Sequence, residues 1–97
     1  MAGGGTFTSD QQVSKLAADG QLVPATQRAR VTYIQAAGVA GGNVKLYNGT
    51  SVAGTLLAEF EFDVDGLSVY VPGSGILFDA GVYLDLTATP GVTIIYT

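Results

Sequence analysis

The sequence contains no histidine, cysteine or tryptophan among its 97 residues. Without histidine it lacks the side chain that most often acts as a general base near neutral pH. Without cysteine it lacks a thiolate nucleophile, disulfides and the sulfur ligands of structural zinc sites. A catalytic Ser-His-Asp triad is excluded because the chain has no histidine. The sequence therefore predicts a protein that is not an enzyme and that carries no cofactor.

Charged side chains are also scarce, at 12% of the chain against 47% hydrophobic. An average soluble domain is about 25% charged, and a small domain with so few charges is poorly protected against association. A chain of this length buries only about 60–65% of its unfolded surface, and neither a disulfide nor a zinc site supplements its core. We therefore expect self-association.

Basic residues are few, and the net charge is −4. Nucleic-acid binding needs a clustered basic face, which Arg28 and Arg30 alone do not form. No segment approaches the roughly 18 apolar residues that span a bilayer, and the N-terminal residues lack the features of a signal peptide. The sequence therefore predicts a soluble protein made in a cytoplasm, with neither a nucleic acid nor a membrane as partner.

Residues 1–27 differ from the rest of the chain and are expected to form an N-terminal arm. Ser9-Asp10-Gln11-Gln12 has the spacing of a capping box, which predicts a short helix ending near Gly20. The arm is expected to be either flexible or docked on a partner. A docked arm is favoured by its large apolar side chains, because a purely solvating tail seldom carries so many; these are Phe7, Val13, Leu16, Leu22 and Val23. Deleting residues 1–24 should then leave a folded domain.

Residues 28–97 alternate apolar and polar side chains, which predicts a β-domain. Strands are expected over residues 28–35, 43–47, 55–64, 67–71, 82–87 and 92–96, with 76–78 as a further strand or a buried corner. Asn48-Gly49 and Asp65-Gly66 predict tight hairpin turns. Six or seven short strands separated by turns are typical of an antiparallel sandwich or small barrel. The predicted fold is all-β: a small antiparallel β-sandwich, jelly-roll-like or barrel-like, with an extended N-terminal arm.

The same alternation sorts the side chains into an inward and an outward set. The inward set is Val44, Leu46, Phe60, Phe62, Val64, Leu67, Val69, Val71, Val82, Leu84, Leu86, Val92, Ile94 and Tyr96. The outward set includes large side chains that are favoured at interfaces, and these predict a partner-binding sheet face: Tyr47, Tyr70, Tyr83 and Ile95. The alternative is that the tyrosines are simply exposed, since tyrosine suits β-strands.

Glu59, Glu61 and Asp63 recur at every second residue and form an acidic row. Such carboxylates stand about 6.5–7 Å apart on one strand face and point in parallel, so they do not converge on one cation. Asp63-Val64-Asp65-Gly66 resembles the opening of a calcium loop, but Ser74 stands where such a loop needs its closing glutamate. The row is expected to be either ion-paired with Arg28, Arg30 or Lys45, or solvated; metal binding is the less favoured reading.

Three segments carry a resemblance to a known family: residues 44–50 (VKLYNGT), 71–78 (VPGSGILF) and 81–86 (GVYLDL). Through them, residues 30–97 resemble small virion proteins of tailed bacteriophages. The resemblance implies a short β-sandwich with an N-terminal arm, located in the virion. It also implies a capsid decoration, or cement, subunit that associates as a homotrimer. Such a subunit is expected to bind the major capsid protein or other virion proteins and to bridge capsomers on the capsid surface. The alternatives are a neck, tail or head-fibre component, and a carbohydrate- or receptor-binding β-module.

Overall fold

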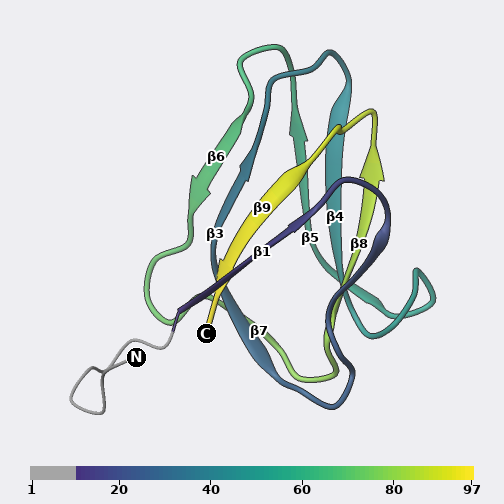
Figure 1. Cartoon of the computed structure of the whole chain (residues 1–97). Coiled ribbons are helices and arrows are strands. Elements are labelled where there is room, and N and C mark those ends of the chain that lie inside the picture. Colours follow the sequence, from purple (N-terminus) through teal and green to yellow (C-terminus); the bar gives the residue numbers. More distant parts are fainter. Residues whose placement is uncertain (1–10) are drawn as a thin grey trace.

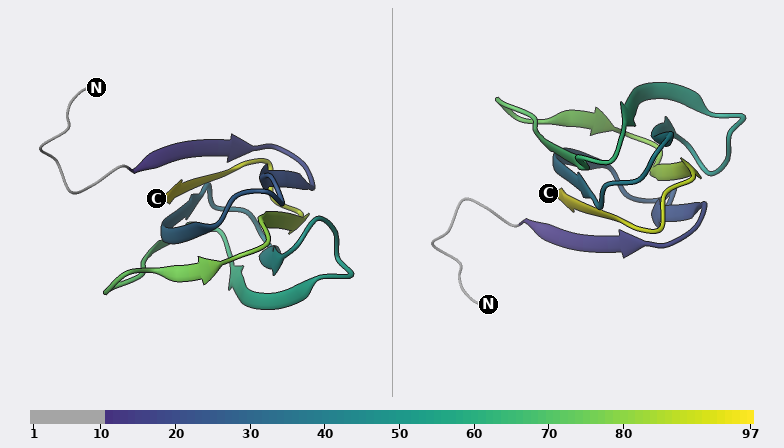
Figure 2. Two further views of the ribbon diagram at one scale, coloured as in Figure 1. Left: turned by 90° about the horizontal axis from the view of Figure 1, so that it is seen from below. Right: turned by 90° about the horizontal axis from the view of Figure 1, so that it is seen from above.

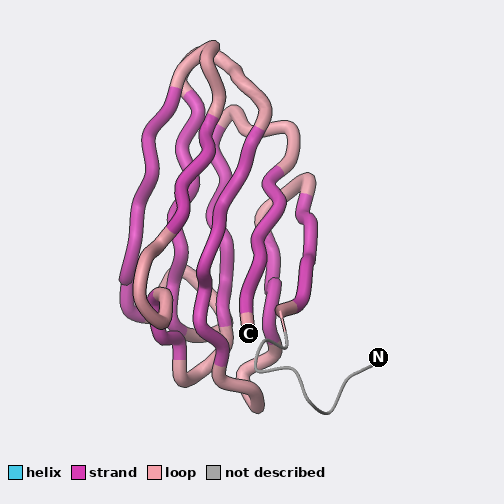
Figure 3. The backbone as a smooth tube through the Cα atoms, turned by 90° about the vertical axis from the view of Figure 1, so that its left-hand side faces the viewer, coloured by secondary structure: helices cyan, strands magenta, loops and turns pink. Residues whose placement is uncertain are grey.

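The computed structural model describes residues 11–97, which form nine β-strands and no helix (Figure 1). The strands run side by side along the molecule and most of the loops lie at its two ends (Figure 3). In chain order they are β1 (Gln12–Leu16), β2 (Gly20–Val23), β3 (Ala29–Ala36), β4 (Gly42–Asn48), β5 (Thr55–Phe62), β6 (Leu67–Tyr70), β7 (Ile76–Phe78), β8 (Val82–Thr87) and β9 (Val92–Tyr96).

The strands form two antiparallel sheets that pack face to face (Figure 2). Sheet A has the order β1-β9-β3-β6, and β7 pairs with the remaining length of β3. β6 lies against residues 33–36 of β3 and β7 against residues 29–31, so the two are successive halves of one interrupted strand. The interruption falls at Pro72-Gly73-Ser74-Gly75, where Gly73 and Gly75 have φ angles of 74° and 80°. Sheet B has the order β2-β8-β4-β5.

The pairing along the chain is nested, as in a long hairpin that has been rolled up. β1 pairs with β9, β2 with β8, β3 with β6 and β7, and β4 with β5. Additional pairing of β3 with β9 and of β4 with β8 joins these ribbons into the two sheets. This arrangement is the strand order of a jelly roll. The all-β sandwich prediction is therefore confirmed, and the structure selects two separate sheets over a closed barrel.

Neither of the two predicted tight hairpin turns forms. Asn48 pairs with Thr55, so residues 49–54 form the β4–β5 loop instead of a tight Asn48-Gly49 turn. The Asn48 side chain donates to Asp79 Oδ1 at 2.8 Å and accepts from the Ala80 N–H at 2.8 Å, which keeps this residue at the end of β4. Asp65-Gly66 joins β5 of sheet B to β6 of sheet A, so it is a crossing between sheets and not a hairpin.

The helix predicted from the capping box is wrong, because residues 12–23 form β1 and β2. β1 completes the edge of sheet A against β9, and β2 completes the edge of sheet B against β8. A helix this short is marginal in water. As strands, the same residues pair with the backbone N–H and C=O groups at the open sheet edges. The predicted domain boundary at residue 27 therefore divides a single sandwich, and residues 1–10 of the predicted arm lie outside the described part.

The core lies between the sheets and consists largely of the inward set predicted from the alternation. Val44, Leu46, Leu84 and Ile94 are fully buried, and Phe60 and Phe62 pack against the core from the edge strand β5. Val71 follows the end of β6 and is only partly buried. Val64 is 71% exposed, because β5 ends at Phe62 and Val64 lies in the following turn. The prediction that Val64 faces inward is wrong.

Candidate interaction surfaces

A row of large side chains crosses the outer face of sheet A, one each from β1, β9, β3 and β6. Val13 of β1 is opposite Ile95 of β9, Ile95 is opposite Tyr33 of β3, and Tyr33 is opposite Tyr70 of β6. Directly opposed residues lie on the same face of a sheet with Cβ atoms about 4.5–5.5 Å apart. Val13 is 64% and Tyr70 68% exposed, whereas Ile95 and Tyr33 are partly buried. These four residues are called the sheet A row.

A β-bulge and a hydroxyl pair fix the centre of this row. Register shifts between Val31 and Tyr33, so Thr32 is the extra residue of the bulge, and its hydroxyl donates to the Ile95 carbonyl at 3.1 Å. The Tyr33 hydroxyl is hydrogen-bonded to the Ser68 hydroxyl of β6. Tyr33 is therefore held outward on the sheet, with its ring beside Ile95 and Tyr70.

A second, shorter row lies on the outer face of sheet B. Tyr47 of β4 is opposite both Tyr83 of β8 and Leu56 of β5. A register shift between Leu46 and Tyr47 makes Leu57 the extra residue of a bulge, and both Leu56 and Leu57 are exposed, at 44% and 41%. Leu56, Tyr47 and Tyr83 are called the sheet B row.

The partner-binding sheet face predicted from sequence is thus divided between two opposite faces. Tyr70 and Ile95 belong to sheet A, and Tyr47 and Tyr83 to sheet B. Sequence reasoning missed Val13, Tyr33 and Leu56 as members of these rows. Val13 was assigned to a helix, and the bulges at Thr32 and Leu57 break the alternation that would have placed Tyr33 and Leu56.

Most residues of the predicted partner-docked arm serve the sandwich itself. Val23 is fully buried in the core, and Leu16 and Leu22 pack against it. Val23 is therefore not available to a partner, and Leu16 and Leu22 are partly buried against the core of their own sandwich. Val13 faces outward in the sheet A row, and Phe7 lies outside the described residues.

The acidic row is divided as well. Glu59 and Glu61 face outward on β5, opposite Lys45 and Asn43, while Asp63 lies beyond the end of the strand. The Glu59 carboxylate accepts a hydrogen bond from Asn43 Nδ2 at 2.8 Å. Lys45 is also opposite Asp85 of β8, so it stands between two acids. Within residues 11–97, Lys45 is the cation that the register places opposite this row, whereas Arg30 belongs to sheet A and Arg28 lies just before β3.

Asp63 has a local role at the turn after β5. Its carboxylate accepts from the Val64 N–H at 2.9 Å, and its carbonyl accepts from Gly66 and Val39 at 2.9 and 3.2 Å. Over residues 11–97, no three His, Cys, Asp or Glu side chains are placed to hold a metal ion together.

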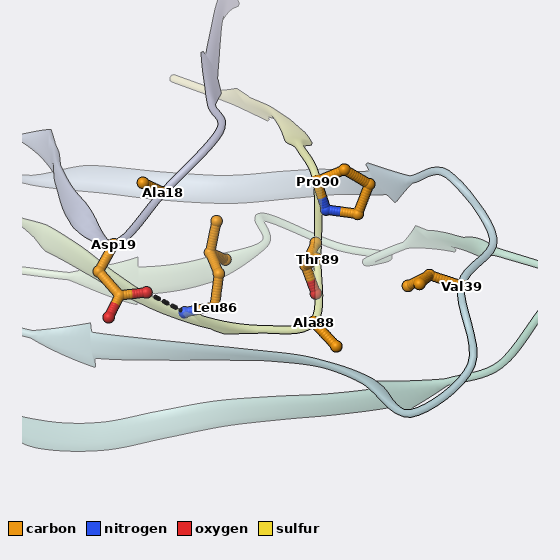
Figure 4. A pocket seen from close by; sticks show the side chains of 7 residues that line it. All are labelled: Ala18, Asp19, Val39, Leu86, Ala88, Thr89 and Pro90. Carbon is orange, nitrogen blue, oxygen red and sulfur yellow. Dashed lines mark hydrogen bonds between the residues drawn. The ribbon is translucent and has the colours of Figure 1, made fainter.

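A shallow depression of about 750 Å³ lies between the loops at one end of the sandwich (Figure 4). Its Asp19 carboxylate accepts from the Leu86 N–H at 2.7 Å, and the Thr89 hydroxyl donates to the Thr87 and Asn43 carbonyls at 2.8 and 3.3 Å. The other lining side chains are aliphatic or proline: Ala18, Val39, Leu86, Ala88 and Pro90. These polar contacts hold the β1–β2 and β8–β9 loops to the sandwich.

Comparisons with protein-family models, curated proteins and solved structures found no match to this chain. Within the part of the chain that the structure describes, no helix is long and apolar enough to cross a membrane.

Proposed function

We propose that this chain is a non-enzymatic structural protein of a tailed-bacteriophage virion, a capsid decoration subunit that bridges neighbouring capsomers. The observation that carries the proposal is a jelly roll with an apolar row on each of its two outer faces. Jelly rolls are a recurrent architecture of viral capsid proteins. Exposed aromatic and aliphatic rows on both faces suit a subunit that is held between other proteins.

The proposed mechanism is burial of these rows on the capsid lattice. Each contact is small, because a row contains only three or four large side chains. Several small contacts on one lattice act together, since binding at one site raises the effective concentration at the next. A rigid antiparallel sandwich keeps the rows in fixed positions, so little conformational entropy is lost on docking.

The proposal is tested on the virions themselves. Phage particles are purified from bacteria that carry this sequence, and their proteins are identified by mass spectrometry. Gold-labelled antibodies against the chain then locate it by electron microscopy. Label on the heads is the expected result, whereas absence of the chain from purified particles contradicts the proposal.

A neck or tail component is the second candidate. It is favoured by the position of the rows on opposite faces, because subunits that associate through two different faces build rings and stacks. In the same experiment, gold label at the neck or along the tail supports this candidate over the decoration subunit.

A further inference from the structure

The two sheets carry opposite charge. The strands of sheet A contain two cations, Lys15 and Arg30, and no acid, which gives +2. The strands of sheet B contain three acids and one cation, which gives −3 + 1 = −2; they are Glu59, Glu61, Asp85 and Lys45. The chain has few charges in all, so their division by sheet gives the sandwich one basic and one acidic face.

These charged side chains all lie on the outer faces. Lys15 alternates with Ser14 and Leu16, whose side chains turn inward, and Arg30 lies between the buried Ala29 and Val31. On sheet B, Asp85 lies between Leu84 and Leu86 and is opposite Lys45; Glu59 and Glu61 are exposed. The cross-strand neighbours of these acids are Lys45, opposite Glu59 and Asp85, and Asn43, opposite Glu61, so one cation stands against three acids and the face stays net negative.

On each face charged residues lie near exposed apolar side chains. On sheet A, Lys15 is two residues from Val13 along β1, and Arg30 lies opposite Leu77 of β7, which is 37% exposed. On sheet B, Asp85 is two residues from Tyr83 along β8. Each face therefore presents an apolar stripe with charges of a single net sign next to it.

We propose that the outer face of sheet A docks on the outer face of sheet B of a second copy of this chain. The sheet A row then packs against the sheet B row, and Lys15 and Arg30 come near the acids of the second copy. Complementary charge fixes which faces meet, and like charges oppose the wrong pairing. Two sheet A faces in contact would bring cations together, and two sheet B faces would bring acids together, so both pairings are repulsive. This inference concerns how copies associate and does not depend on the proposed virion location.

The contact is heterologous, so it has a consequence for the assembly. The two outer faces of a sandwich point in opposite directions. After each docking step, a basic sheet A face is still free at one end of the assembly and an acidic sheet B face at the other. Repeated docking builds a ring of several copies or an open stack. A compact homotrimer, the assembly expected from the sequence, would instead need a contact that turns each copy by a third of a circle.

Charge inversion of each face tests the proposal. The first variant carries Lys15→Glu and Arg30→Glu, which changes the strands of sheet A from +2 to about −2. The second carries Glu61→Lys and Asp85→Lys, which changes the strands of sheet B from −2 to about +2. Wild-type protein is expected to form assemblies larger than a monomer by light scattering and analytical ultracentrifugation. Each variant alone is expected to associate about tenfold or more weakly.

The equimolar mixture of the two variants is the decisive sample. Every A–B contact between unlike variants again joins opposite charges, so assembly should return to nearly the wild-type level. Asp65→Lys is the matched control: it changes an exposed acid in the turn after β5, outside both faces, and should leave wild-type assembly intact. Circular dichroism verifies that each variant is folded.

Three results would overturn the inference: a monomeric wild-type protein, variants that assemble as the wild type does, or a mixture that stays dissociated. Should a variant fail to fold, the assembly state of the wild-type protein is measured at increasing salt concentration. Salt screens charges, so an interface held by opposite charges must dissociate, and assembly that does not weaken contradicts the inference. A trimer unaffected by charge inversion refutes head-to-tail docking and leaves the capsid proposal standing. Conversely, absence of the chain from virions leaves the docking result unchanged.

Discussion

At the residue scale, glycine sets how closely two loops approach at one end of the sandwich. A Cβ on Gly38 would lie 1.9 Å from the Val64 carbonyl oxygen and 2.9 Å from the Gly66 nitrogen. Next to it, the Val39 N–H donates to the Asp63 carbonyl at 3.2 Å. The loop after β3 therefore lies directly on the turn after β5, and only a residue without a side chain fits between them.

Gly38→Ala is accordingly expected to destabilise the fold by about 1–3 kcal/mol, because backbone atoms cannot yield as side chains do. Gly20→Ala is the control, since the nearest atom to its added Cβ would be 3.8 Å away. Urea denaturation of the wild type and both variants measures the difference. Equal midpoints for the two variants would show that the loop contact is not as close as described.

Core burial gives a second prediction at the same scale. Leu84 is fully buried in β8 between β2 and β4, so Leu84→Ala removes apolar contacts and leaves a cavity. We expect a loss of about 2–5 kcal/mol in the free energy of unfolding. Val52→Ala in the β4–β5 loop, where the side chain is 56% exposed, should change it by less than about 0.5 kcal/mol. A small effect at Leu84 would contradict the observed core.

At the scale of elements, β1 and β2 make the N-terminal region part of the domain. β1 covers β9 and β2 covers β8, so each shields an otherwise open strand of the sandwich. The Gln21 side-chain amide also donates to the Gly49 carbonyl at 2.9 Å and to the Val82 carbonyl at 3.0 Å. These bonds connect β2 to β8 and to the start of the β4–β5 loop.

Two N-terminal deletions should therefore behave differently. Removal of residues 1–10 keeps every strand pairing described here and should leave a cooperative thermal transition. Removal of residues 1–24 takes away β1, β2 and the buried Val23, and should abolish that transition. Circular dichroism during heating distinguishes them. A folded 1–24 deletion would restore the independent arm that the sequence predicted.

At the scale of the whole molecule, nested pairing brings the described ends together. Gln12 is opposite Tyr96, and the chain between them rolls up around the β4–β5 loop. Almost every strand pair is thus remote in sequence, which predicts folding in milliseconds to seconds, as for other sandwiches.

A circular permutant follows from this closure. Residue 97 is joined to residue 11 by a short glycine linker, and the chain is opened between Ser51 and Val52 in the β4–β5 loop, where both residues are exposed. Such loop tips tolerate new termini, so a native-like β spectrum and a cooperative transition are expected. A permutant opened between Leu84 and Asp85, inside β8, is the control and should not fold. Failure of the loop permutant would contradict the nested topology.

The sequence by itself determined the fold class, most strand positions and most of the core. Apolar residues at every second position from Val82 to Leu86 and from Val92 to Tyr96 leave one arrangement of faces, because a side chain in a strand has only two directions. The absence of histidine and cysteine excluded the commonest catalytic and zinc-binding groups without reference to any fold. The prediction of a partner-binding set of outward-facing side chains also came from the alternation alone.

Tertiary structure decided the rest. Residues 12–23 satisfy a helix motif locally, but the open edges beside β9 and β8 exist only once those strands have formed, so no local pattern could predict their pairing. The bulges at Thr32 and Leu57 placed Tyr33 and Leu56 on outer faces against the alternation. The division of charge between two faces likewise follows from strand order, because Lys15 and Arg30 share a face only through the pairing of β1 and β3 with β9.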